Sequence, residues 1–237
     1  MSDRSASRMA AVQRRFGLPA AATGALDRLL ELIAADPTAP TAVVDVARAI
    51  DVHVADALVS LQLDAIRGAR RIADIGSGAG FPGIVLAAAL PAARVALVES
   101  NGRKCDFLAR AAEAMGLQNV EIVRSRAEEW RDGIGVHDAV TARAVAPLNV
   151  LVEYAAPLLA TGGTLVAWKG RRDAREERDA DAAAGATGLS VAEVCPVQPW
   201  DGAEHLHLHR YLKVACTPNR YPRRAGIASK RPLRAST

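Results

Sequence analysis

The part of the sequence best suited to holding a ligand is a glycine-rich run, Asp74-Ile75-Gly76-Ser77-Gly78-Ala79-Gly80-Phe81-Pro82-Gly83. It follows a short apolar stretch with strand character and opens an apolar stretch with helical character. Glycines let the chain turn sharply and approach a ligand without a Cβ in the way. Pro82 suits the first turn of a helix, where its missing N–H costs little. We therefore expect a strand–loop–helix unit that binds a ligand through its backbone.

A carboxylate, Glu99, follows the next predicted strand, 23 residues after Gly76. In that position it can accept hydrogen bonds from both ribose hydroxyls of an adenosine. The end of the loop formally matches the GxGxxG of nicotinamide-binding domains. However, the spacing Gly76-x-Gly78-x-Gly80, with Asp74 upstream, resembles the first motif of class I S-adenosylmethionine-dependent methyltransferases. We favour S-adenosylmethionine as the cofactor, while a nicotinamide and a purely structural glycine turn stay open.

Three cationic side chains, Arg126, Arg143 and Lys169, fall at the ends of later predicted strands. Such strand ends border the ligand crevice of a doubly wound sheet, where Arg and Lys bind phosphates or bases. We assign catalytic roles to these three residues and to His53, and we expect them to converge on one crevice. Asp56, three residues further along the predicted helix, is expected to orient the imidazole. The alternative for the three cations is that they form surface ion pairs, and the alternative for His53 is that it has only a local partner at the end of its helix.

Alternating strands and helices must position these residues. The predicted helices lie near residues 6–16, 20–35, from 53 onward, 82–90, 102–115, 148–159 and 172–184. The predicted strands are 71–75, 94–98, 120–123, 138–141, 164–168, 189–194 and 206–215. This pattern predicts an α/β, Rossmann-like fold with a mostly parallel seven-stranded sheet flanked by helices. We expect an N-terminal helical cap (1–66), a methyltransferase-like domain (67–217) and a basic C-terminal tail (218–237).

Further motifs narrow the family. They are Ser125-Arg126-Ala127-Glu128-Glu129, Thr141-Ala142-Arg143-Ala144, Trp168-Lys169-Gly170 and Tyr221-Pro222-Arg223-Arg224-Ala225-Gly226. In this order, over roughly residues 53–233, they resemble the bacterial small-subunit ribosomal RNA methyltransferase G family, also called glucose-inhibited division protein B. The resemblance implies a class I methyltransferase that uses S-adenosylmethionine to methylate a guanine N7 in 16S rRNA.

The resemblance also implies roles for residues at matching positions. It places Gly76 and Phe81 in the cofactor loop, Ala127 and Glu128 along the adenine, and Arg143 at the cofactor or the target. The full set expected to bind the cofactor is Asp74, Gly76, Ser77, Gly78, Gly80, Phe81, Glu99, Ala127, Glu128 and Arg143. Guanine N7 already carries a lone pair, so its methylation needs no general base and can depend on proximity and electrostatics.

The excess positive charge is concentrated at the C-terminal end. The 237 residues carry 30 Lys and Arg against 26 Asp and Glu, a net +4, and six basic residues with no acidic one follow Thr217. Such a tail can bind nucleic-acid phosphates; a solvated terminus is the alternative. We assign RNA contacts to Arg220, Arg223, Arg224 and Lys230. The implied partner is 16S rRNA or the 30S ribosomal subunit.

The composition argues against several other classes. Three cysteines without CxxC spacing favour neither a disulfide scaffold nor a zinc cluster. His205, His207 and His209 alternate as on an ordinary strand face, and we do not assign them a metal. No apolar run is long enough to span a bilayer, and the first fifteen residues lack a signal-peptide core. We expect a cytoplasmic monomer with no metal and no membrane partner.

The chain departs from the family pattern in two places. The family usually carries an Asn-Leu-Thr stretch where this chain has Ala39-Pro40-Thr41, and an arginine near Glu204-His205-Leu206. Both departures lie where RNA, not the cofactor, is expected, and they leave the target nucleotide open. Two alternatives remain: a non-catalytic or differently targeted S-adenosylmethionine-binding protein associated with RNA or ribosomes, and a nicotinamide-dependent oxidoreductase.

Overall fold

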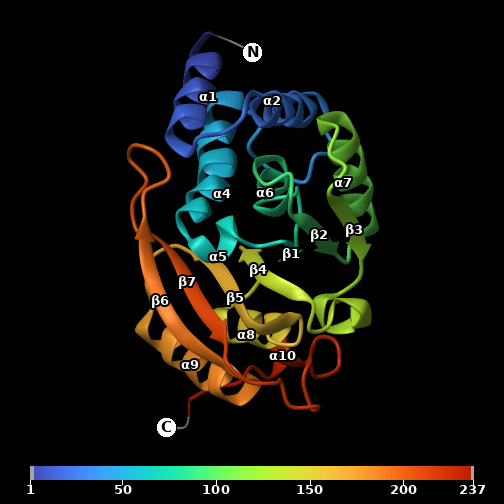
Figure 1. Ribbon diagram of the computed structural model, residues 1–237, viewed down its shortest axis with the longest axis vertical. Helices are drawn as coiled ribbons and strands as arrows, with labels where there is room; N and C mark the ends of the chain where they lie inside the picture. The colour runs from blue at the N-terminus through green and yellow to red at the C-terminus, as the bar shows by residue number, and fades with distance from the viewer. Residues whose placement is uncertain (1–2, 236–237) are drawn as a thin grey trace.

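A seven-stranded sheet forms the centre of the computed structural model, which describes residues 3–235 (Figure 1). The strand order is β3-β2-β1-β4-β5-β7-β6. The strands are β1 (Arg71–Ile75), β2 (Arg94–Glu99), β3 (Val120–Arg124), β4 (His137–Arg143), β5 (Leu159–Lys169), β6 (Leu189–Val197) and β7 (Leu206–Lys213). The first five are parallel, whereas β7 runs antiparallel between β5 and the edge strand β6. The predicted α/β class and mostly parallel sheet are confirmed.

Helices cover both faces of this sheet (Figure 1). The longer ones are α1 (Asp3–Phe16), α2 (Ala20–Ala35), α6 (Gly83–Ala89), α7 (Gly102–Met115), α8 (Leu148–Ala155) and α9 (Ala174–Thr187). The short ones are α3 (Val46–Ala49), α4 (Asp56–Leu58), α5 (Asp64–Arg67) and α10 (Ile227–Lys230), with 3-10 turns at Val59–Gln62, Ala127–Glu129 and Arg131–Gly133. The N-terminal helices share one face with α6 and α7, and α8 and α9 cover the other.

Capping residues set the boundaries of α7 and α9, two helices whose starts lie within two residues of the predicted ones. The α7 helix begins after Asn101, whose side chain accepts hydrogen bonds from two backbone N–H groups, and ends at Gly116 with φ 71°. The α9 helix begins after Asp173, which caps it in the same way, and ends at Gly188 with φ 82°. These are the usual N-cap and left-handed C-terminal signals. The α9 helix runs three residues beyond its predicted end because Gly188, not Gly185, terminates it.

The helix predicted to begin near His53 begins earlier, at Val46. Asp45 caps it by accepting a hydrogen bond from the N–H of Arg48 at 2.7 Å. A π-helical segment, Ile50–Ala55, follows directly and contains His53. Such π segments are rare and frequently occur at functional sites. The Asp45 signal was available in the sequence, but the widened π turn was not.

The first strand and the helix after it pack unusually closely. Gly83 opens α6, and a Cβ placed on it would lie 2.5 Å from Cδ2 of Leu97 in β2 and 2.6 Å from Cβ of Asp74 in β1. Both distances are below van der Waals contact. Gly83 therefore allows α6 to lie directly against the two strands that carry the ligand loop and Glu99.

We predict that Gly83→Ala destabilises the fold by about 1–3 kcal/mol because the added methyl overpacks a close helix–sheet contact. Thermal unfolding of the purified variant measures this loss. Gly185→Ala is the matched control, since Gly185 lies in α9 with no atom within 4 Å of a Cβ, and its melting temperature should equal or slightly exceed that of the parent. Equal melting temperatures for Gly83→Ala and the parent would contradict the packing argument.

Candidate active site

The glycine loop leaves β1 in a conformation that favours glycine. Gly76, Gly78 and Gly80 have φ values of 68°, 58° and 99°, in the left-handed region where a Cβ is penalised. A Cβ on Gly76 would also lie 2.6 Å from Cγ2 of Val145, just after β4. Around Gly78 the space is open, the nearest atom to a Cβ being 3.8 Å away. The loop therefore forms an open backbone cradle at the carboxyl end of β1.

Asp74, Ser77 and Gly80 lie behind this cradle. Oδ1 of Asp74 accepts a hydrogen bond from the Thr141 hydroxyl at 2.8 Å, and Ser77 Oγ donates to the Asp74 carbonyl at 2.7 Å. Asp74 and Ser77 are only 1% and 2% exposed, and burial raises the pKa of Asp74 to about 6 against these hydrogen bonds. A Cβ on Gly80 would meet Ile84 at 2.8 Å. The structure gives these three residues a supporting position behind the loop, and their contact with the cofactor stays a prediction.

A cavity of about 230 Å³ opens beside the loop, at the carboxyl ends of β1, β2 and β3. It is lined by Ile75, Gly76, Val98, Glu99, Ser100, Ser125, Arg126, Ala127, Glu128, Val145, Ala146, Tyr154 and Ser229. We call it the cofactor cavity. Five of the predicted residues, Gly76, Glu99, Arg126, Ala127 and Glu128, do come together here. Tyr154 and Ser229 were missed, because nothing in their local sequence distinguishes a cavity residue from an ordinary helix residue.

Glu99 ties the loop to the end of β2. Its carboxylate accepts hydrogen bonds from the backbone N–H of Gly78 at 3.1 Å and of Asn101 at 2.8 Å. A carboxylate has about four lone-pair sites, so each oxygen retains acceptor capacity toward the cavity. An open glycine cradle beside a carboxylate acceptor suits an adenosine with vicinal ribose hydroxyls. The residues present therefore fit the predicted cofactor.

A second cavity, of about 310 Å³, opens beyond the end of β4; we call it the target cavity. Its lining residues are Asp56, Arg143, Ala144, Trp168, Lys169, Gly170, Leu206 and His207. Arg143 donates to the Asp56 carboxylate at 2.7 Å and to the Val52 carbonyl at 2.9 Å, and its guanidinium lies 5.4 Å from the Phe81 ring centroid. Arg143 therefore contacts both the cap and the end of the glycine loop.

His53 does not pair with Asp56, so that prediction was wrong. The Asp56 carboxylate binds Arg143. His53 Nε2 instead lies 2.9 Å from the Thr41 hydroxyl, and its ring stacks on Phe81 at 4.3 Å between centroids. Burial, followed by the nearby Arg143 charge, lowers the pKa of His53 to about 4, so the imidazole is neutral at pH 7. Thr41, noted in the sequence only as a departure from the family, is thus part of the site.

The three strand-end cations divide between the two cavities. Lys169 lies in the target cavity and pairs with Glu176 of α9 at 2.6 Å. Arg126 is exposed at the rim of the cofactor cavity. The expectation that both converge with Arg143 on one crevice is therefore corrected, since β3 and β5 end on opposite sides of the β1–β4 pair.

The basic tail is folded against the domain. Arg223, which we predicted to contact RNA, instead pairs with the buried Glu153 of α8 at 2.5 Å. Arg220, Arg224 and Lys230 are exposed. Between residues 3 and 235, no group of three or more His, Cys, Asp or Glu side chains is placed to hold a metal ion. No helix in the described part of the chain is long and apolar enough to cross a membrane.

We predict that Gly78→Arg abolishes binding of S-adenosylhomocysteine, because the side chain projects from the open cradle that the ligand must occupy. Calorimetric titration measures the affinity. Gly162→Arg is the matched control: Gly162 also has positive φ and no atom within 4 Å of a Cβ, but it lies within β5. Both variants bear the same backbone strain. Unaltered affinity in Gly78→Arg would place the ligand elsewhere.

Solved structures similar to this one share its fold. A predicted O-methyltransferase from Agrobacterium tumefaciens is 24% identical, with a TM-score of 0.53 over 68% of this chain and 81% of that chain. A 16S rRNA (adenine(1408)-N(1))-methyltransferase from Catenulisporales acidiphilia is 21% identical, with a TM-score of 0.52 over 65% and 90% of the two chains. These likenesses confirm the class I methyltransferase fold.

Sequence comparison is more specific. The family "rRNA small subunit methyltransferase G" (GidB) matches residues 37–200. The Ribosomal RNA small subunit methyltransferase G of Rubrobacter xylanophilus is 45% identical over 188 residues, which cover 77% of this chain and 72% of that protein. Its counterpart from Desulfitobacterium hafniense is 40% identical over 184 residues, covering 76% of each. The family predicted from the motifs is confirmed: this chain belongs to the ribosomal RNA small subunit methyltransferase G family.

Proposed function

We propose that this protein transfers a methyl group from S-adenosylmethionine to N7 of a guanine in 16S rRNA. The observation that carries the proposal is the segment after β4. Arg143 and Ala144 line the target cavity, and Val145 and Ala146, the next two residues, line the cofactor cavity. The two cavities therefore meet at one four-residue segment, so a methyl donor and a base bound in them are held close together, and proximity is what direct transfer requires.

The side chains around the target cavity suit guanine. When bound, S-adenosylmethionine supplies an electrophilic methyl group on its sulfonium. Guanine presents O6 beside N7 as an acceptor that Arg or Lys can bind, and Arg143 and Lys169 are the cations at this cavity. A hydrogen bond to O6 leaves the N7 lone pair free to attack the methyl group. Guanine N7 carries no proton at neutral pH, so no base is needed before it attacks the methyl group. His53, neutral at pH 7, therefore serves as a packing partner for Phe81 rather than as a general base.

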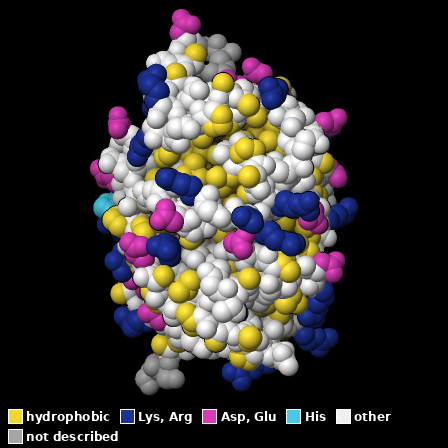
Figure 2. Space-filling model, viewed as in Figure 1, with side chains coloured by type: hydrophobic (Ala, Val, Ile, Leu, Met, Phe, Trp, Pro, Cys, Tyr) yellow, Lys and Arg dark blue, Asp and Glu magenta, His cyan; other side chains and the backbone are white. Residues whose placement is uncertain are grey.

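The relatives are named as methyltransferases of small-subunit ribosomal RNA. Their names favour a methyltransferase over the nicotinamide-dependent oxidoreductase. We further propose the assembled 30S subunit or its 16S rRNA as the partner, the cytoplasm as the location, and a monomer as the active form. The body of the protein fits a specific enzyme rather than an RNA-coating protein. Figure 2 shows Lys and Arg interspersed with Asp and Glu over the visible face rather than gathered in one continuous patch.

Methylation mapping tests the activity directly. The protein is incubated with labelled S-adenosylmethionine and either 30S subunits or naked 16S rRNA from a strain that lacks the modification, and methylated nucleotides are located by mass spectrometry. We expect one N7-methylguanine with the parent protein and none with Gly78→Arg. Binding of cofactor and RNA without any product would establish the non-catalytic alternative, and a different methylated atom would overturn the guanine-N7 assignment.

The exposed tail cations should contribute electrostatically to RNA binding. We predict that Arg224→Ala weakens binding of 16S rRNA and reduces the slope of log affinity against log salt by about 1, because one phosphate contact is lost. Arg94→Ala is the control, an exposed cation at the amino end of β2, the opposite end of the strand from Glu99 and the cofactor cavity, and its salt slope should equal that of the parent. Filter binding across a salt series measures both, and identical slopes for the two variants would exclude the tail contact.

A further inference from the structure

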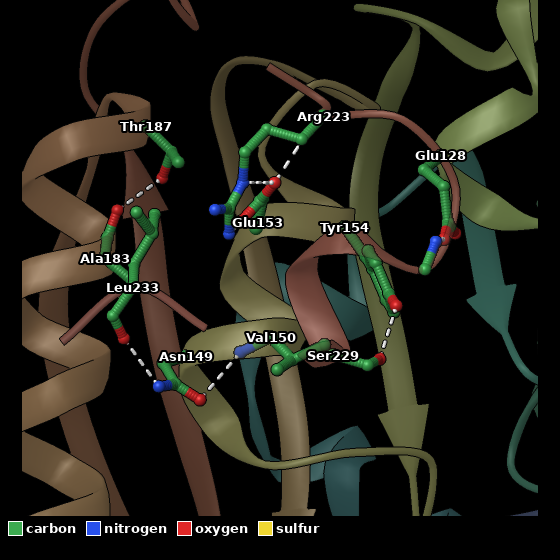
Figure 3. Close-up of polar contacts among 11 residues, drawn as sticks. Glu128, Asn149, Val150, Glu153, Tyr154, Ala183, Thr187, Arg223, Ser229 and Leu233 are labelled. Carbon is green, nitrogen blue, oxygen red and sulfur yellow. Dashed lines mark hydrogen bonds and ion pairs between the residues drawn. The ribbon is translucent and has the colours of Figure 1, made fainter. Parts of the chain in front are cut away.

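The C-terminal segment 220–235 is fastened along α8 and α9, and we call it the strap (Figure 3). Near its start, Nε of Arg223 donates to Oε1 of Glu153 at 2.8 Å, and the Glu153 side chain is 1% exposed. Near its end, the Asn149 side chain donates to the Leu233 carbonyl at 2.6 Å, and Asp179 accepts from the N–H of Ala235 at 3.0 Å. A buried carboxylate that loses its cation is costly, so the strap is held at both ends.

Between these anchors the strap crosses the edge of the cofactor cavity. The backbone N–H of Gly226 donates to Oε1 of Glu128 at 2.9 Å. The Ser229 hydroxyl lies 3.0 Å from the Tyr154 hydroxyl, and Ala228 between them is 3% exposed. Glu128, Tyr154 and Ser229 all line the cavity. Figure 3 shows Tyr154 and Ser229 pointing toward each other from α8 and α10.

The position of Ser229 within the cavity indicates which part of the ligand it meets. Glu99 and Gly76 lie where the glycine loop meets the ends of β1 and β2, which suits ribose and the methionine portion. Ala127 and Glu128 follow β3, and Ser229 of α10 lines the same cavity. Adenine is the part of the cofactor that extends past the ribose, and its ring nitrogens and amino group accept and donate hydrogen bonds. A hydroxyl, which does both, complements them.

We propose that the strap forms the adenine-side wall of the cofactor cavity and that the Ser229 hydroxyl, oriented by Tyr154, binds the adenine. The inference rests on the proposed function for the identity of the ligand. It gives the tail a second role beside its exposed cations: residues from the far end of the chain complete a cavity begun by β1. Glu128 and Tyr154 then act as positioning residues, one holding the Gly226 turn and the other the serine.

Ser229→Ala and Tyr154→Phe test this wall, each removing one hydroxyl. Titration with S-adenosylhomocysteine, without RNA, should give about 3–10-fold weaker binding for either variant, the worth of one hydrogen bond. The double variant should be little weaker than either alone, because both act through one interaction. Tyr221→Phe is the matched control: among the described residues its hydroxyl has no hydrogen-bond partner, and it lies outside the cofactor cavity; its affinity should match the parent.

Kinetics separate a binding role from a merely structural one. In the methylation assay we expect Ser229→Ala to raise KM for S-adenosylmethionine while kcat and KM for RNA stay near the parent values, with an unchanged melting temperature. Parent-like affinity in both Ser229→Ala and Tyr154→Phe would overturn the strap proposal and leave the proposed function intact. Failure of the parent protein itself to bind S-adenosylhomocysteine would overturn both.

Trypsin supplies a second readout on the unmodified protein. The strap carries cleavable bonds after Arg220, Arg223, Arg224, Lys230 and Arg234, whereas Pro232 protects the bond after Arg231. If the ligand contacts the strap, S-adenosylhomocysteine should slow cleavage at these bonds, since binding suppresses local opening. Equal cleavage rates with and without saturating ligand would count against the proposal.

Discussion

The partly buried ion pair between Arg143 and Asp56 is the contact on which the arrangement of the site depends. Arg143 ends the central strand β4, and Asp56 lies in the helical cap, 87 residues earlier. The cap is held to the sheet by further bonds at the same place, from Arg143 to the Val52 carbonyl at 2.9 Å and from Trp168 Nε1 to the Asp56 carbonyl at 2.8 Å. Burying two charges is favourable only when their other hydrogen-bonding groups are also satisfied, which explains why several elements meet at one guanidinium.

The glycine loop depends on a related constraint, a buried carboxylate beneath an exposed turn. Asp74 stays 1% exposed because Thr141 and the close approach of Gly83 enclose it. The residues visible to a ligand are then backbone atoms of Gly76 and Gly78, with Glu99 fixed beside them. The glycine-rich motif therefore contains two kinds of residue: Asp74 is buried and supports the loop, whereas Gly76 and Gly78 face the space where a ligand can bind.

The C-terminal segment also contributes to the site. The six basic residues after Thr217 account for the positive net charge, yet the tail does not behave as one electrostatic unit. Arg223 is committed to Glu153, Ser229 lines the cofactor cavity, and Arg224 and Lys230 remain exposed. One short segment therefore both lines a cavity and presents exposed cations to solvent.

The sequence by itself determined the strands, the glycine loop, Glu99 and the family, because strand–helix periodicity and glycine conformation are local properties. It also located Arg143 and Lys169, since parallel strands end at a common edge. Only the tertiary structure decided the partners. Asp56 binds Arg143 rather than His53, Arg223 binds Glu153, and Tyr154 and Ser229 meet across 75 residues of chain. Such pairings depend on which side chains are buried together, and burial is set by the packing of distant elements rather than by neighbours in the sequence.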